Sequence, residues 1–223
     1  MARPATNLAV FIRDKTLELL LEKEPEEIST RDIAKACGVT ATSLYYYYKD
    51  KDVLFNEVKL CCIEKMDAAI AEQIARVPEI NRKKSIKIDP FLEVRAGLEA
   101  FRDWAFENSR IALLVMGRLK ADINADSEKM KKYYHSTVFA KEALDKLVKK
   151  GFYNSNDTLC DACLYIAALW GAIESVLLKR TIPQFWTKRG ALYFTDSMIN
   201  LVISSLRTPG TGDRTGDGVI EKK

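Results

Sequence analysis

The stretch that most constrains the fold of this 223-residue chain begins at Ser29 and reads STRDIAKACGVTATSLYYYYKDKDVLF. Ser29, followed three positions later by an aspartate, fits a variant of the capping box and predicts a short helix over about 30–36. Gly38 ends that helix, because glycine accepts the left-handed backbone that a tight turn requires. Thr40 can cap a second short helix over about 41–47. Two short helices joined by a glycine turn are typical of a helix-turn-helix, whose second helix enters the major groove of DNA.

Four consecutive tyrosines, at positions 45–48, end this stretch of short helices. Because a helix turns by about 100° per residue, the four side chains cannot all face the same way. We expect Tyr48 to pack chiefly in the core and the other three to face DNA, where a phenol hydroxyl can reach a backbone phosphate. The alternative is an aromatic core patch or a protein interface. Three or four consecutive helical positions cannot all be buried, however, so some must face outward.

The rest of the chain also favours helices, and we expect an all-α fold without strands. Apolar residues at spacings of three, four and seven over 8–23 predict the first long helix. A segment between two prolines, VPEINRKKSIKIDP, predicts a linker or loop, and the Gly- and Thr-rich tail over 207–223 predicts disorder. Further helices are expected over about 51–76, 90–107, 109–122, 127–150 and 157–180, and from near Pro183 to Leu206.

Composition is that of an ordinary folded protein, with 48% hydrophobic and 30% charged residues. The net charge is +4, but residues 1–60 hold nine Lys or Arg and ten Asp or Glu, a net charge of −1. Bulk charge therefore does not identify a nucleic-acid partner. Apolar runs are interrupted by charge before they reach the length of a membrane span, and no signal peptide is evident, so we expect a cytoplasmic protein.

Residues of about 8–58 resemble the DNA-binding domain of the tetracycline-repressor (TetR) family of bacterial regulators. The shared pattern is Thr or Ser, Ile-Ala, Gly-Val-Ser/Thr, Leu-Tyr, an aromatic pair, and Lys before an acidic residue and Leu. Two departures are Glu24-Pro25, where the family has a glycine–aromatic pair, and Ala41, where a longer polar residue is frequent. The resemblance implies phosphate contacts from Thr30, Ser43, Tyr45, Tyr47 and Lys51, and base contacts from Thr40, Ala41, Thr42 and Tyr46.

The expected organisation is a three-helix DNA-binding domain over 1–50, a larger helical ligand-binding and dimerisation domain over 51–206, and the tail over 207–223. The resemblance implies an inducer site in the larger domain and a dimer formed by the last two helices. Independently, LCDACLYIAALWGAIESVLL is apolar nearly all round, more than packing within one subunit needs. Burial within a monomer is the alternative. The last helix carries a similar set, Leu192, Tyr193, Ile199, Leu201, Val202 and Leu206.

Candidate ligand contacts come from aromatic and methionine residues of the larger domain, although the same residues at helical spacing also build cores. The single histidine offers no convincing metal site, and we expect no metal and no cofactor. The candidates are Phe101, Trp104, Met116, Tyr133, Tyr134, His135, Phe139 and Trp170.

These features favour a sequence-specific DNA-binding regulator, most simply a dimeric repressor that an apolar small molecule releases from a palindromic operator. No nucleophile with a nearby base, phosphate loop or metal cluster supports an enzyme. The five cysteines are interpreted as reduced thiols. A thiol-responsive regulator that uses Cys160 and Cys163, with Cys61 and Cys62, is the alternative function.

Overall fold

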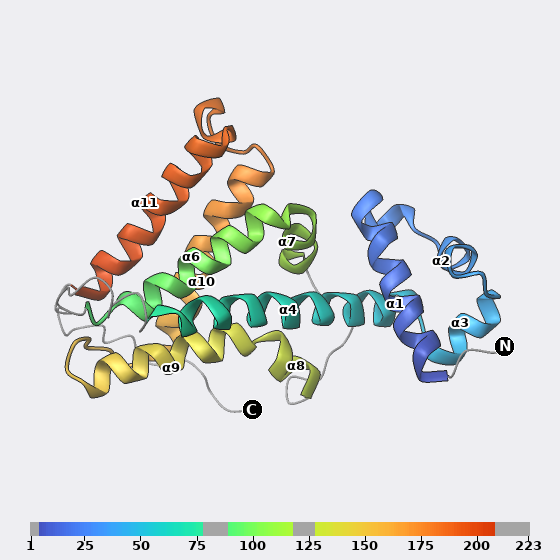
Figure 1. Cartoon of the computed structure of the whole chain (residues 1–223), viewed down its shortest axis with the longest axis horizontal. Coiled ribbons are helices and arrows are strands. Elements are labelled where there is room, and N and C mark those ends of the chain that lie inside the picture. The colour runs from blue at the N-terminus through green and yellow to red at the C-terminus, as the bar shows by residue number, and fades with distance from the viewer. Residues whose placement is uncertain (1–4, 78–88, 118–127, 208–223) are drawn as a thin grey trace, which may run out of the picture.

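The computed structural model describes residues 5–77, 89–117 and 128–207 of the chain. Over these ranges the secondary structure is helical, with no strand, so the expected all-α class is confirmed. Figure 1 shows a small group of helices at one end, a larger bundle at the other, and one long helix running from the first into the second. Most of the predicted linker, and the predicted tail beyond residue 207, lie outside the described residues.

The small group consists of α1 (Ala5–Glu22), the 3-10 turn η1 (Pro25–Glu27), α2 (Thr30–Cys37) and α3 (Ala41–Tyr47). The predicted capping box is confirmed: the Ser29 hydroxyl accepts from the amide of Asp32, and the Asp32 carboxylate accepts from the amide of Ser29. Gly38 closes α2 with a φ of +66°. Ile12, Ile33 and Leu44, one from each helix, are fully buried and form the centre of this domain.

The Glu24-Pro25 departure from the family pattern is accommodated by η1. Pro25 begins this turn, where its fixed φ is favourable, and the Glu27 carboxylate accepts from the amide of Glu24. The ammonium of Lys51 donates to the carbonyls of Pro25, at 3.1 Å, and of Ile28, at 2.9 Å. These two hydrogen bonds hold the connection between α1 and α2 against the start of the helix that follows α3.

That next helix is α4 (Lys51–Ala75), which is capped by Asp50 as the sequence predicted: the amide of Val53 donates to its carboxylate at 2.8 Å. The first turns of α4 bury Leu54 and Val58 and contact α1. Further along, α4 contacts α6, α7 and α8 of the larger bundle. A single helix therefore belongs to the cores of both groups, and a domain boundary at residue 51 stays a prediction.

The larger bundle is organised around α10, which packs against α6, α9 and α11. Its buried centre includes Phe101, Leu144, Leu169 and Ile199. The elements are α6 (Leu92–Glu107), α7 (Ser109–Met116), α8 (Glu128–Tyr133), α9 (His135–Lys149), α10 (Thr158–Leu177), the 3-10 turn η2 (Pro183–Trp186) and α11 (Lys188–Arg207).

The prediction of one helix over 127–150 is wrong in one respect, because the helix is interrupted at Tyr134 and forms α8 and α9. Polar side-chain contacts on either side of the break join the chain to α4. Lys132 pairs with Glu64 at 2.8 Å, and His135 lies 2.9 Å from Asp67. Contacts with α4 therefore override the propensity of a continuous helix.

The last helix does not start near Pro183 as predicted, because Pro183 begins the separate turn η2. Thr187 then adopts an extended backbone, and its hydroxyl accepts from the amide of Gly190 at 3.1 Å. Gly190 is required here, since a Cβ at this position would lie 2.0 Å from the carbonyl oxygen of Gln184. A helix was also predicted over 109–122. Within the described residues it ends at Met116, and residues 118–122 lie outside them.

Charge interrupts the apolar run of α10 at Asp161 and Glu174, as the sequence predicted. Among the described helices, only Thr158–Leu177 is long and apolar enough to cross a membrane. Length and composition alone are weak evidence for a span, because an interior helix of a folded bundle has the same properties. In this fold α10 lies between α9 and α11, with Ala162, Leu169 and Ile173 buried against its neighbours.

Candidate nucleic-acid interface and ligand cavity

Helix α3 presents its tyrosines on two different sides. Tyr45 and Tyr46 are 53% and 82% exposed, whereas Leu44 is buried against the domain core. Tyr47 is half-buried, and its ring packs edge-on against that of Tyr46 with the ring centroids 5.2 Å apart. The tyrosine run therefore leaves two phenols available at the outer surface of the domain.

Tyr48 was predicted to belong to the core, and this is confirmed. Its side chain is buried, and its hydroxyl donates to the carbonyl of Ala9 in α1 at 3.1 Å. Burial raises the pKa of the Tyr48 phenol. Tyr48 thus fixes the end of α3 against α1 and cannot present its ring to a partner.

The other predicted DNA contacts surround the start of α3. Thr40 and Thr42 are exposed, while Thr30, Ala41 and Ser43 are half-buried. The hydroxyl of Thr40 accepts from the amide of Ser43 at 3.1 Å, and the two hydroxyls lie 2.9 Å apart. Thr40 thus caps α3 and stays at the surface. DNA contacts from these residues remain predictions.

The ammonium of Lys51, a predicted phosphate contact, is bonded within the domain. This ammonium has three N–H groups, and two carbonyls of the α1–α2 connection accept from it. At most one N–H is left for phosphate. Arg31 on α2 and Lys49, two residues after α3, are exposed cations. The bonds of Lys51 depend on the path of η1, so no local pattern in the sequence predicts them.

A second candidate site is a cavity of about 150 Å³ between α4, α6, α9 and α10. Its walls are almost entirely apolar, and the rings of Phe101 and Trp170 stack at its edge with their centroids 5.6 Å apart. Of the predicted ligand contacts, this cavity is lined by Phe101, His135, Phe139 and Trp170.

The remaining four candidates do not line the cavity. Trp104, Met116 and Tyr133 are partly buried against the core, and Tyr134 is exposed. Most of the lining was missed because aliphatic and small residues at helical spacing look the same whether they face a core or a cavity. The missed lining residues include Met66, Asp67, Ile70, Ile74, Val94, Gly97, Leu98, Ala140, Tyr165 and Ile166.

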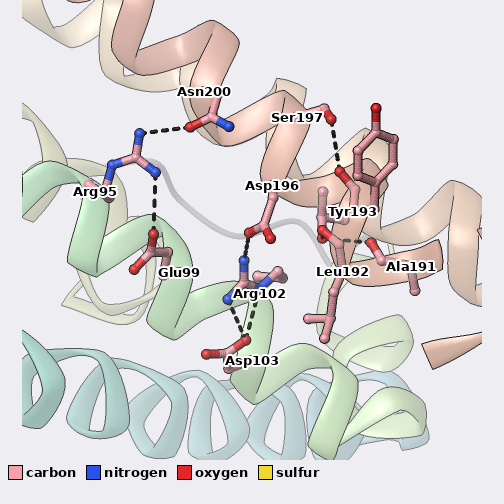
Figure 2. A network of polar contacts seen from close by, with 11 residues as sticks. Arg95, Glu99, Arg102, Asp103, Ala191, Leu192, Tyr193, Asp196, Ser197 and Asn200 are labelled. Atoms are coloured by element: carbon pink, nitrogen blue, oxygen red, sulfur yellow. Dashed lines mark hydrogen bonds and ion pairs between the residues drawn. The ribbon is translucent and has the colours of Figure 1, made fainter. Parts of the chain in front are cut away.

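Helix α6 has a second face, which is polar and meets α11 (Figure 2). Arg95 donates to the side chain of Asn200 at 2.8 Å, and Arg102 pairs with Asp196 across the same gap. The Arg102 side chain is largely buried and also bonds its neighbour Asp103. The helix that carries Phe101 into the cavity is therefore joined to the final helix by two arginines on one face.

The thiol-responsive alternative receives no support. Burial raises the pKa of Cys37, and raises that of Cys62 to about 11, so both thiols stay protonated near neutral pH and are poor nucleophiles. Cys160 and Cys163 are exposed on α10 but form no disulfide. Within the described part of the chain, no group of three or more His, Cys, Asp or Glu residues could hold a metal ion.

The three-helix domain, with α2 and α3 joined by the turn at Gly38, has the arrangement of a helix-turn-helix. Residues 12–58 match the sequence model of the bacterial regulatory proteins of the tetR family. Residues 12–58 are therefore a DNA-binding domain of the tetR family of bacterial regulators, and the chain has the fold of solved TetR family regulators.

Solved structures share the whole fold at low sequence identity. FadR, the fatty acid degradation regulator of Bacillus halodurans, is 16% identical with a TM-score of 0.60, over 93% of this chain and 99% of FadR. PfmR, a TetR family regulator from Thermus thermophilus, is 16% identical with a TM-score of 0.58, and the match covers 86% of this chain and 97% of PfmR. A TetR regulator from a Rhodococcus species is 18% identical with a TM-score of 0.57, and the match covers 92% of this chain and 99% of that regulator. No curated protein sequence matches the chain.

Replacing two neighbouring tyrosines should separate DNA contact from folding. Tyr48→Ala should lower the free energy of unfolding by about 3–5 kcal/mol, because it empties a buried site. Tyr46→Ala should change that free energy by less than about 0.5 kcal/mol, yet alter which duplexes are selected from a random DNA library. Urea unfolding and duplex selection measure the two effects. If Tyr46→Ala destabilises the fold as much as Tyr48→Ala, the run is a core feature.

Proposed function

We propose that this protein is a cytoplasmic, dimeric transcriptional repressor that leaves a palindromic operator when an apolar small molecule occupies the cavity. The observation that carries the proposal is the position of α4, which starts in the helix-turn-helix domain and also forms one wall of the cavity. We expect no enzymatic activity and no membrane partner.

Helix α4 supplies the coupling between the two sites. Leu54 and Val58 are buried where α4 meets the DNA-binding domain, and Met66 and Ile70 line the cavity two to three turns later. A ligand that displaces Met66 or Ile70 must also move the start of the helix, unless α4 bends. Lys51 would carry that movement directly to the connection between α1 and α2.

The dimer surface that we propose is the outer side of α10 and α11. Leu164 on α10 and Leu201 on α11 are 53% and 65% exposed, and Tyr193 is exposed beside them on α11. Other apolar residues of the last helix, Ile199, Val202 and Leu206, are buried within the subunit and are not available to a partner. A twofold pairing of this surface would place two α3 helices for two half-sites about 34 Å apart.

The polar contacts between α6 and α11 extend the coupling to this dimer surface. Phe101 and Leu98 face the cavity from α6, while Arg95 and Arg102 hold α11 from the same helix. A ligand that shifts α6 would therefore shift α11 with it. An effector can move the equilibrium only by its difference in affinity for the two arrangements, so the ligand must prefer the arrangement that does not fit DNA.

A charge placed on the proposed dimer surface should dissociate the protein without unfolding it. Leu164→Glu and Leu201→Glu should each give a folded monomer, because pairing would bury an unmatched carboxylate at a cost of several kcal/mol. Val138→Glu, at an exposed apolar residue on α9, is the matched control and should stay dimeric. Sedimentation equilibrium and circular dichroism report the two properties. A wild-type protein that is monomeric at micromolar concentration would contradict the proposal.

Filling the cavity should remove the ligand response while DNA binding persists. Ala140 lines the cavity, so Ala140→Phe should occupy its volume and abolish ligand-induced release. Val138→Phe changes the exposed side of the same helix and should respond as the wild type does. Operator affinity, measured by fluorescence anisotropy with and without a hydrophobic ligand found by thermal shift, is the test. The coupling is absent if that ligand stabilises the wild type but leaves its operator affinity unchanged.

A further inference from the structure

The apolar cavity is lined by one partly buried carboxylate, that of Asp67 on α4. Its side chain is 13% exposed, and its Oδ2 lies 2.9 Å from Nδ1 of His135. Its other oxygen, Oδ1, is buried and has no hydrogen-bond partner within the described part of the chain. An unpaired carboxylate oxygen in apolar surroundings is costly, and structures seldom keep one without a reason.

The hydrogen bond to His135 engages only one of the two oxygens of Asp67. When Asp67 is ionised it only accepts, and Nδ1 of His135 is then the donor to Oδ2. Burial raises the pKa of the Asp67 carboxyl, and the bond from His135 acts in the opposite sense. A second donor at Oδ1 would offset the loss of hydration that burial causes.

The remaining charged groups of the cavity favour a cation over an anion. Glu93 is the other acidic residue in the lining, and no lysine or arginine is found among the described lining residues. A ligand carboxylate would meet Asp67 and Glu93, and the imidazole of His135 is already bonded to Asp67. An ammonium group would instead find an acceptor at Oδ1, and a charge-assisted hydrogen bond is about twice as strong as a neutral one.

The volume and the walls limit the apolar part of the ligand. A cavity of about 150 Å³ is the size of an engineered protein cavity, on the order of 150 Å³, that binds benzene. Phe101 and Trp170 provide a stacked aromatic pair at one side, and Ile70 and Leu98 provide aliphatic contacts. One ring with a short side chain fits this space.

We infer that the cavity takes a compact hydrophobic amine, whose ring packs against Phe101 and Trp170 and whose ammonium donates a hydrogen bond to Oδ1 of Asp67. This inference rests on the proposed function only in treating the cavity as the effector site. Binding itself can be measured without DNA, because Trp170 lines the cavity and its fluorescence reports occupancy.

The test uses three probes of equal size, 2-phenylethylamine, 2-phenylethanol and phenylacetate, titrated into the full-length protein. The amine should bind about tenfold more tightly than the alcohol, and the acid most weakly, because only the amine brings a charged donor to Oδ1. Asp67→Asn should weaken amine binding by about tenfold and change alcohol binding by less than about threefold. Urea unfolding confirms that the variant is folded.

Glu64→Gln is the matched control, since Glu64 lies on the same helix, is exposed and pairs with Lys132 outside the cavity. It removes the same charge and should leave amine affinity unchanged. The inference is overturned if phenylacetate or 2-phenylethanol binds as tightly as the amine, if none of the probes binds, or if Asp67→Asn leaves amine binding intact.

Operator release by the same probes separates this inference from the proposed function. If the amine binds through Asp67 but operator affinity does not change, the ligand class stands and the proposed release mechanism fails. If a different hydrophobic molecule releases the operator while the amine does not bind, the release mechanism stands and the ligand class is wrong.

Discussion

The burial of α4 on two cores is the constraint on which the rest of the structure depends. Leu54 and Val58 belong to the DNA-binding domain, and Met66 belongs to the larger bundle, so neither group of helices is complete without it. The start of α4 is held by the Asp50 cap and by the bonds from Lys51 to two carbonyls. A helix that is fixed at one end and lines a cavity near the other can report occupancy only by moving as a unit or by bending.

Helix α6 repeats this arrangement in the larger bundle. Its apolar side faces the cavity through Leu98 and Phe101, and its arginines hold α11 (Figure 2). Buried Arg102 carries the greater weight, because leaving a buried guanidinium without its carboxylate is costly. The cavity is therefore bounded by one helix that leads to the DNA-binding domain and by another that leads to the proposed dimer surface.

Local signals in the sequence predicted the DNA-binding domain well. The capping box at Ser29, the turn at Gly38 and the buried position of Tyr48 each depend on residues near in sequence and on helical rotation. The break at Tyr134 and the bonds of Lys51 depend on distant segments, so no local pattern could reveal them. Four of the eight predicted ligand contacts line the cavity, but most of its lining was missed, because Ile70, Leu98 and Asp67 resemble ordinary core and surface positions.

The central claim is that the ligand changes the geometry of the two DNA-binding domains through α4. Double electron–electron resonance measures the distance between two spin labels, one on each subunit, and tests this claim most directly. The labels are attached at Lys35→Cys, an exposed position on α2, in a protein whose Cys61, Cys160 and Cys163 are replaced by serine. On the operator, the two α3 helices must match a spacing of about 34 Å. The account predicts that a ligand bound in the cavity shifts the label distances away from those of the operator-bound dimer. Distances that stay the same at ligand saturation would contradict it.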